Sequence, residues 1–312
     1  MAVALATMGM SDVIQGRFGE GGAWLDRAER ALPPELEPAT AVLLYFSRGL
    51  QHAGQGDDAR AIAALLAAEE LQTRLVSRHA LTVQTRELLA QLQLRRGDIE
   101  GARTTLTRFS EDERDWGEAR GAVASLRLAE DDPQGATRVL APVLQGTVPF
   151  LREFTLVRAL LLDAIAHERL RDRATVDTDI ERALELAERD ALIVPFVVTP
   201  ARELVARHAR GSTAHPALLS DILEVLAGSA PRARPDSDDE MVTDLTESEL
   251  RVLRYLPSHL SAQEIRGELF VSVSTVKTHM RHVYEKLGVH RRTEAVERAR
   301  QIGLLGPSVR HR

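Results

Sequence analysis

Apolar residues recur at helical spacing through the first 228 residues of this 312-residue chain. Ala, Leu, Arg and Glu dominate there, and Gly or Asp interrupts the pattern roughly every 15 to 20 residues. Runs of β-branched residues are rare. Spacing of this kind indicates amphipathic α-helices rather than the alternation of strands. We therefore expect an all-α fold.

A repeat runs through these helices. We place its turns about 34 to 41 residues apart, at Gly19, Gly56, Gly97, Asp131 and Arg171. Five residues after each turn the side chain is in most cases small (Trp24, Ala61, Ala102, Ala136, Val176), and nine residues after it is apolar (Ala28, Leu65, Leu106, Leu140, Ile180). The period resembles tetratricopeptide-like arrays. We predict an α-solenoid over residues 1–228, whose concave surface would hold a peptide, a small ligand or another domain. A less regular helical bundle is the alternative.

Two prolines, Pro195 and Pro200, end the last clear repeat. The helices expected at 202–208 and 218–226 would then cover the end of the array. Residues 229–244 follow as a linker, because they carry prolines and an acidic run but no apolar periodicity.

The residues from 245 to 312 predict a second, smaller domain built on capped helices. Thr246 and Glu249 form one capping box, and Ser261 and Glu264 form another. Ser272 then caps a helix expected at about 273–286.

The helix expected at about 273–286 has two distinct faces. On a helical wheel its apolar residues share one sector: Val276, Met280, Val283, Tyr284 and Leu287. The neighbouring sector carries two hydroxyls and two cations: Ser274, Lys277, Thr278 and Arg281. A cationic, hydrogen-bonding helix face suits the DNA major groove, where Lys and Arg reach guanine edges. The helix N-terminus also favours a phosphate.

These motifs, together with Lys286-Leu287-Gly288-Val289 and Arg292-Thr293-Glu294-Ala295-Val296, resemble the LuxR-type helix-turn-helix. We expect Lys277, Thr278 and Arg281 to read base edges. Phosphate contacts and positioning would come from Ser272, Ser274, Thr275 and Lys286. In this family the last helix commonly supplies the dimer contact, which here would involve Ala295, Val296, Ala299 and Ile302. Packing of that stripe on the domain's own core is the alternative.

Charge supports the same division of the chain. The net charge is −6, but the residues from Thr246 onward carry 12 Lys and Arg against 7 Asp and Glu. Both lysines of the chain, Lys277 and Lys286, lie in this basic end. An acidic body joined to a basic end is typical of a sensor joined to a DNA-binding module.

The sequence lacks the motifs that mark several classes of protein. The chain has no Cys and no Gly-x-Ser-x-Gly motif, so we expect no enzyme and no bound metal. It has no run of about 18 apolar residues, and we expect a cytoplasmic protein without membrane contact.

The helical region and the basic end together resemble the C-terminal part of the MalT-like, large ATP-binding LuxR regulators. No phosphate-binding loop ending in Gly-Lys-Ser/Thr occurs, so we expect neither the ATPase module of that group nor a cofactor. The resemblance implies a transcription regulator that binds double-stranded DNA as a homodimer. A small-molecule inducer or a protein partner on the helical region would control it. The alternative is an interaction scaffold whose DNA-binding domain retains little affinity.

Overall fold

The computed structural model describes residues 1–32, 38–73, 75, 81–228, 249, 252–253, 255–256, 261–263, 265, 273–287, 289 and 291–301. These residues form helices and turns without a strand, which confirms the all-α class. The chain divides into two compact units, Met1–Ala233 and Arg234–Arg312. The boundary falls within the predicted linker 229–244, which lies outside the described residues.

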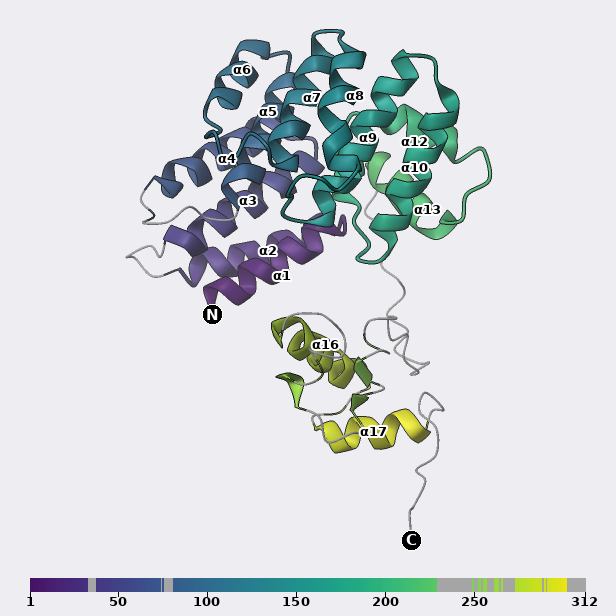
Figure 1. Cartoon of the computed structure of the whole chain (residues 1–312). Helices are drawn as coiled ribbons and strands as arrows, with labels where there is room; N and C mark the ends of the chain where they lie inside the picture. The colour runs from purple at the N-terminus through teal and green to yellow at the C-terminus, as the bar shows by residue number, and fades with distance from the viewer. Residues whose placement is uncertain are drawn as a thin grey trace. The chain divides into compact units, whose positions relative to one another are not determined.

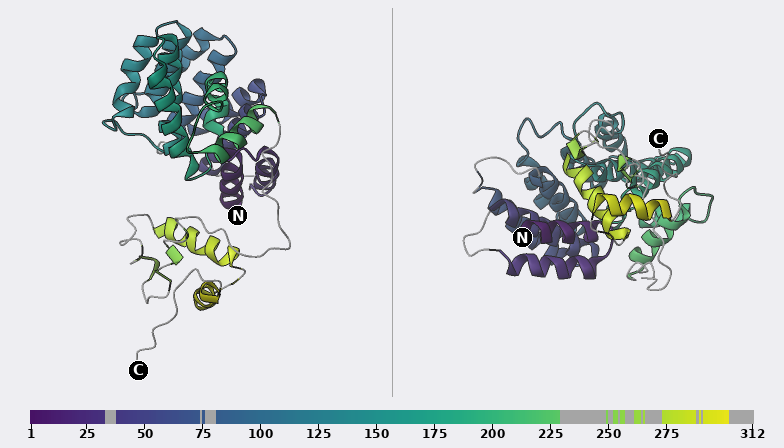
Figure 2. Two further views of the ribbon diagram at one scale, coloured as in Figure 1. Left: turned by 90° about the vertical axis from the view of Figure 1, so that its right-hand side faces the viewer. Right: turned by 90° about the horizontal axis from the view of Figure 1, so that it is seen from below.

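Helical hairpins follow one another along the first unit, and Figures 1 and 2 show their succession from three sides. The two helices of each hairpin pack together, and the first helix of each contacts the first helix of the next. The hairpins are α1 (Ala2–Ile14) with α2 (Phe18–Arg30), α3 (Pro38–Gly54) with α4 (Asp58–Gln72), α5 (Leu81–Arg95) with α6 (Ile99–Thr107), α7 (Gly117–Ala129) with α8 (Pro133–Leu144), and α9 (Glu153–Arg169) with α10 (Arg173–Glu188). The short helices α11 (Val194–Val198), α12 (Arg202–His208) and α13 (Pro216–Leu226) complete the unit. The tetratricopeptide-like assignment of this stack stays a prediction.

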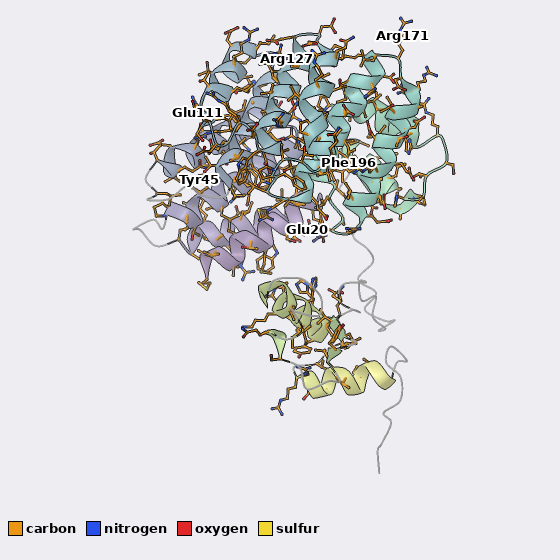
Figure 3. All side chains as sticks on the ribbon, viewed as in Figure 1. Glu20, Tyr45, Glu111, Arg127, Arg171 and Phe196 are labelled. Atoms are coloured by element: carbon orange, nitrogen blue, oxygen red, sulfur yellow. The ribbon has the colours of Figure 1, made fainter. Side chains whose placement is uncertain are left out.

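Each hairpin turns at a residue in the left-handed backbone region. The turn residues are Gly16, Gly56, Gly97, Asp131 and Arg171, with φ between 59° and 79°. Figure 3 shows Arg171 at the tip of the α9–α10 turn, pointing away from the helices. This conformation ends the first helix and lets the chain reverse into the second.

The structure corrects the first predicted turn. Gly19 lies inside α2 and is exposed, whereas the chain turns at Gly16. Counted from Gly16, the fifth and ninth following residues are Gly21 and Leu25, and both are buried. The first hairpin therefore follows the small-then-apolar pattern that Trp24 had seemed to break.

An Asp begins the second helix after four of the five turns. In each case its side chain accepts a hydrogen bond from the backbone N–H three residues on, which is the geometry of an N-cap. The distances are 3.0 Å from Asp57 to Arg60 N, 2.9 Å from Asp98 to Gly101 N, 2.8 Å from Asp132 to Gly135 N and 3.3 Å from Asp172 to Thr175 N. In the first hairpin Arg17 takes this position and makes no such bond.

The helices of a hairpin approach closely because a small residue lies seven places before each turn. These residues are Gly9, Gly49, Ala90, Ala124 and Ala164, and all are buried. A Cβ built on Gly49 would lie 2.6 Å from Leu65 Cδ2, and one on Gly9 would lie 2.7 Å from Leu25 Cδ2. The leucines nine residues after these turns thus pack directly on backbone.

The short helix α11 lies between distant hairpins, because it contacts α1, α3 and α9. Val194 and Val198 join the apolar cluster of α1 to α5, whereas Phe196 joins the cluster of α7 to α13. All three side chains are fully buried, and Figure 3 shows Phe196 among the helices. Ile193 N also donates to Ile14 O at 3.0 Å, which ties the end of the unit to its start. The chain's own segment therefore packs against the first helices of three hairpins.

A polar network is buried between α5, α7 and α9, the first helices of three consecutive hairpins. Arg158 of α9 reaches Glu87 of α5, with 2.7 Å between Nη1 and Oε1. Both side chains are at most 2% exposed. Arg158 Nη2 also donates to Gln91 Oε1 at 3.3 Å, and Ser125 Oγ of α7 donates to the same oxygen at 2.8 Å. Burial raises the pKa of Glu87 to about 8, although Arg158 opposes the shift.

Candidate nucleic-acid interface

The second unit is organised around α16 (Val273–Lys286) and α17 (Arg292–Gln301). Along α16 the predicted apolar seam is buried: Val276 and Val283 have no exposed surface, and Met280 and Tyr284 are partly buried. Leu287, just past the helix, is 5% exposed. The hydrophobic stripe therefore fixes which side of α16 faces inward.

The predicted base-reading residues lie on the outer side of the same helix. Lys277, Thr278 and Arg281 are all exposed, within two turns of one another. Val276 is fully buried and Met280 packs against the apolar cluster of this unit, whereas these three side chains present a cationic surface to solvent. Of the predicted positioning residues, Ser272 lies outside the described residues. Ser274 and Thr275 belong to the first turn of α16, but their side chains are not described.

Lys286 has a partner within the domain. Its Nζ donates to Glu249 Oε2 at 2.6 Å, and the Glu249 side chain is 4% exposed. His282 Nδ1 lies 3.6 Å from the other carboxylate oxygen. The two residues are 37 positions apart, and no local sequence pattern indicated that they would pair. Lys286 therefore neutralises a buried carboxylate, and its ammonium is less available to a phosphate than the sequence suggested.

The predicted dimer residues lie in the core of this unit. Ala295 and Ala299 have no exposed surface, and Val296 is 8% exposed. They pack in one cluster with Val252, Leu253 and Leu256 and with residues of α16. The stripe thus packs on its own domain, which was the alternative interpretation, while Ile302 lies outside the described residues.

Arg292 fixes the start of α17, a role that sequence reasoning missed. Its Nε donates to Leu256 O at 2.9 Å, and its Nη2 donates to Tyr255 O at 3.1 Å. These bonds connect α17 to the helical segment that contains Leu253 and Leu256. Burial raises the pKa of Tyr284 beside this junction, although the charge of Arg292 opposes the rise.

Comparison with known proteins gives one family match within this unit. Residues 243–299 match the family described as bacterial regulatory proteins, luxR family. The C-terminal unit contains a LuxR-type domain. The HTH-type transcriptional regulator MalT of Serratia proteamaculans (strain 568) is 48% identical to the chain over 58 residues.

The extent of this second match is limited. It covers 19% of this chain and 6% of the MalT sequence, so the chain aligns with only a small part of that relative. The family match falls at residues 243–299, within the C-terminal unit. No solved structure matches the chain. Within the described residues, the helices are too short or too polar to cross a bilayer.

Proposed function

We propose that the chain is a sequence-specific DNA-binding transcription regulator whose LuxR-type domain places α16 in the major groove. The observation that carries the proposal is the exposed face of Lys277, Thr278 and Arg281, opposite a buried seam on the same helix. A helix held by its apolar side presents the other side to base edges, and Lys and Arg are the commonest partners of guanine O6 and N7.

The three exposed residues would divide the reading between them. Lys277 and Arg281 are one helical turn apart, which separates them by about 6 Å along the axis. Neighbouring base pairs are about 3.4 Å apart, so the two cations would reach different base pairs. Thr278 lies beside them and offers a hydroxyl and a methyl group to a thymine or a phosphate.

The first turn of α16 would hold the DNA backbone. Ser272, Ser274 and Thr275 would supply hydroxyls there, because the sequence puts them at the start of the helix, where backbone N–H groups lack a partner within the helix. Phosphate contacts of this kind fix the register of the helix in the groove but carry no base information.

A homodimer on a pseudo-palindromic site would complete the reader, because one short helix contacts few base pairs. Burial of Ala295, Val296 and Ala299 indicates that such a dimer would use other residues. Control of DNA binding would come from a ligand or a protein bound to the helical hairpins of the first unit.

Binding of the full chain to labelled duplex DNA, followed by fluorescence anisotropy, tests the proposal. Targets would first be selected from random or genomic fragments. We expect Lys277→Ala and Arg281→Ala each to cost about 1–3 kcal/mol and to relax the preference at different base pairs. Arg210→Ala removes an equal charge from an exposed position in the first unit and serves as the control.

Two other outcomes separate the alternatives. An equal loss on all sequences would mean that Lys277 and Arg281 contact phosphate only. Absence of binding by the native chain even at about 50 mM salt, where phosphate contacts are strong, would favour the interaction scaffold with little DNA affinity.

A further inference from the structure

A pocket of about 520 Å³ opens between the second and third hairpins, and is called here the α4–α5 pocket. Its volume suits a small molecule, because ligand pockets commonly measure about 300–1,000 Å³. Four of its lining side chains are charged: Glu69 and Glu70 near the end of α4, Arg86 of α5, and Arg108 just after α6. Leu66 adds an apolar residue that is 43% exposed.

The charged groups of the α4–α5 pocket are held by one another. Arg86 Nε donates to Glu69 Oε1 at 3.0 Å, and Arg86 Nη1 donates to Glu113 Oε2 at 2.9 Å. Arg108 Nη1 donates to the other oxygen of Glu69. The ring of Phe109 lies 6.0 Å from Cζ of Arg86, within the range of a cation–π contact. The two guanidinium groups are therefore fixed in place rather than extended into solvent.

Packing of the helical array does not require charge at this place. Glu69 lies 13 residues after one hairpin turn, and Arg86 lies 11 residues before the next. Between the fourth and fifth hairpins the equivalent residues are Leu144 and Leu160, which belong to one apolar cluster. The second and third hairpins thus place an ion pair where apolar side chains can make the same junction.

Both guanidinium groups keep N–H groups beyond those in the ion pairs. A guanidinium has five N–H donors, and the bonds to Glu69 and Glu113 occupy two of Arg86 and one of Arg108. The Arg86 side chain is 17% exposed and that of Arg108 is 41% exposed, and both line the pocket. Planar N–H donors of this kind bind carboxylates through paired hydrogen bonds.

The pocket also carries negative charge, which limits the ligands that fit. Glu69 contacts both guanidinium groups, and the exposed Glu70 follows it on α4. A purely anionic ligand would be repelled by these carboxylates, and a purely cationic ligand would be repelled by Arg86 and Arg108. A ligand with both charges satisfies both sets of groups.

We propose that the α4–α5 pocket binds a free α-amino acid. Its carboxylate would accept hydrogen bonds from Arg86 and Arg108, and its ammonium group would pair with Glu70, since Glu69 already accepts from both arginines. One carbon atom separates the two charged groups of an α-amino acid, which suits a pocket where groups of opposite charge are neighbours. Leu66 would contact the ligand's side chain. The proposal names the ligand that controls DNA binding, and only in that effect does it rest on the proposed function.

Thermal unfolding of the full chain tests for binding. The midpoint is measured by scanning calorimetry with each soluble L-amino acid in turn at about 10 mM. A ligand that binds the folded chain raises the midpoint, and at about ten times its Kd we expect a rise on the order of 3 °C. No rise with any amino acid overturns the proposal. The measurement contains no DNA, so this failure would leave the proposed DNA-binding function untouched.

Analogues of the bound amino acid test the requirement for both charges. Isothermal titration compares it with one analogue that lacks the ammonium group and one that lacks the carboxylate. Each should bind at least about tenfold more weakly, because each leaves charged groups of the pocket without a partner. Equal affinity of the acid analogue would indicate an anion site, and equal affinity of the amine analogue a cation site; either result overturns the proposal.

Three variants of the full chain test the location. Arg108→Ala and Glu70→Gln each remove one charge from an exposed lining residue, and each should lower the affinity at least about tenfold. Arg138→Ala removes a charge from an exposed position of α8 outside the pocket and should leave the affinity unchanged. Native affinity in both Arg108→Ala and Glu70→Gln would mean that the amino acid binds elsewhere, and the proposal would be wrong.

Discussion

Replacing Glu87 with Gln should change how the stability of the first unit depends on pH. Glu87 is 2% exposed, with its Oε1 at 2.7 Å from Nη1 of Arg158 and close to Gly121, whose built Cβ would lie 2.6 Å away. Burial raises the pKa of its carboxyl to about 8, and the carboxylate of Glu118 adds to the rise, whereas Arg158 opposes it. Gln keeps the shape and one carbonyl oxygen of the protonated acid but cannot ionise.

The direction in which stability changes with pH follows from the pH at which Glu87 loses its proton in the folded and in the unfolded chain. An exposed glutamate in the unfolded chain releases its proton near pH 4.5, whereas the folded chain retains it until about pH 8. The stabilisation from this proton is therefore fully present below pH 4.5 and is lost as the pH rises towards 8. Each pH unit in this interval is equivalent to about 1.4 kcal/mol, so the full loss is roughly 5 kcal/mol.

Urea unfolding of the native chain and of Glu87→Gln at pH 5 and pH 8.5 measures this effect. The difference between the two proteins isolates Glu87, since every other titrating group is common to both. We expect Glu87→Gln to gain several kcal/mol relative to the native chain between these pH values. If the carboxyl is instead ionised in an ion pair with Arg158, its pKa lies below 4.5 and the native chain keeps or increases its advantage as the pH rises. That result would refute the reasoning.

Three further substitutions test packing, charge and capping, each by its effect on unfolding free energy. Gly49→Leu should destabilise the first unit by about 1–3 kcal/mol through overpacking against α4. Leu at exposed Gly19, where no atom lies within 4 Å of the built Cβ, should be neutral or stabilising. Equal effects of the two substitutions would contradict the close approach of α3 and α4. Lys286→Ala should destabilise the second unit by about 3 kcal/mol, because it removes the ammonium group that pairs with the buried Glu249 carboxylate, and Gln at position 249 should restore much of the loss. A loss of DNA affinity with unchanged stability would instead assign Lys286 to phosphate. Asp98→Ala should cost about 1 kcal/mol by removing an N-cap, and Asn at that position should retain most of it; an equal loss with Asn would point to charge rather than capping.

The sequence alone determined the features that depend on local periodicity. Apolar spacing predicted the all-α class, and the wheel of α16 predicted that Val276 and Val283 would be buried while Lys277 and Arg281 would be exposed. Each residue of an α-helix is rotated by a fixed angle of about 100° from the one before it. A stripe of apolar side chains therefore fixes the inner side of the helix before any partner is known.

Hairpin register was only partly predictable. The turns at Gly56 and Gly97 were identified correctly, because Gly followed by Asp is a strong signal for ending one helix and capping the next. The first turn was misplaced from Gly16 to Gly19, since several glycines lie close together there and Arg17 replaces the Asp that marks the other turns. The backbone φ angle shows which of these glycines forms the turn, whereas their spacing in the sequence does not.

Contacts between residues distant in sequence were decided by the tertiary structure. Periodicity showed that Ala295 and Val296 form an apolar stripe, but the same stripe serves a dimer or a domain core equally well, and only its packing against Leu253 shows which surface covers it. The pairing of Lys286 with Glu249 likewise depends on how α16 lies against an earlier helical segment. A hydrophobic pattern predicts that a side chain is buried. Which residue it contacts depends on how all the helices pack together, and a local pattern does not contain that information.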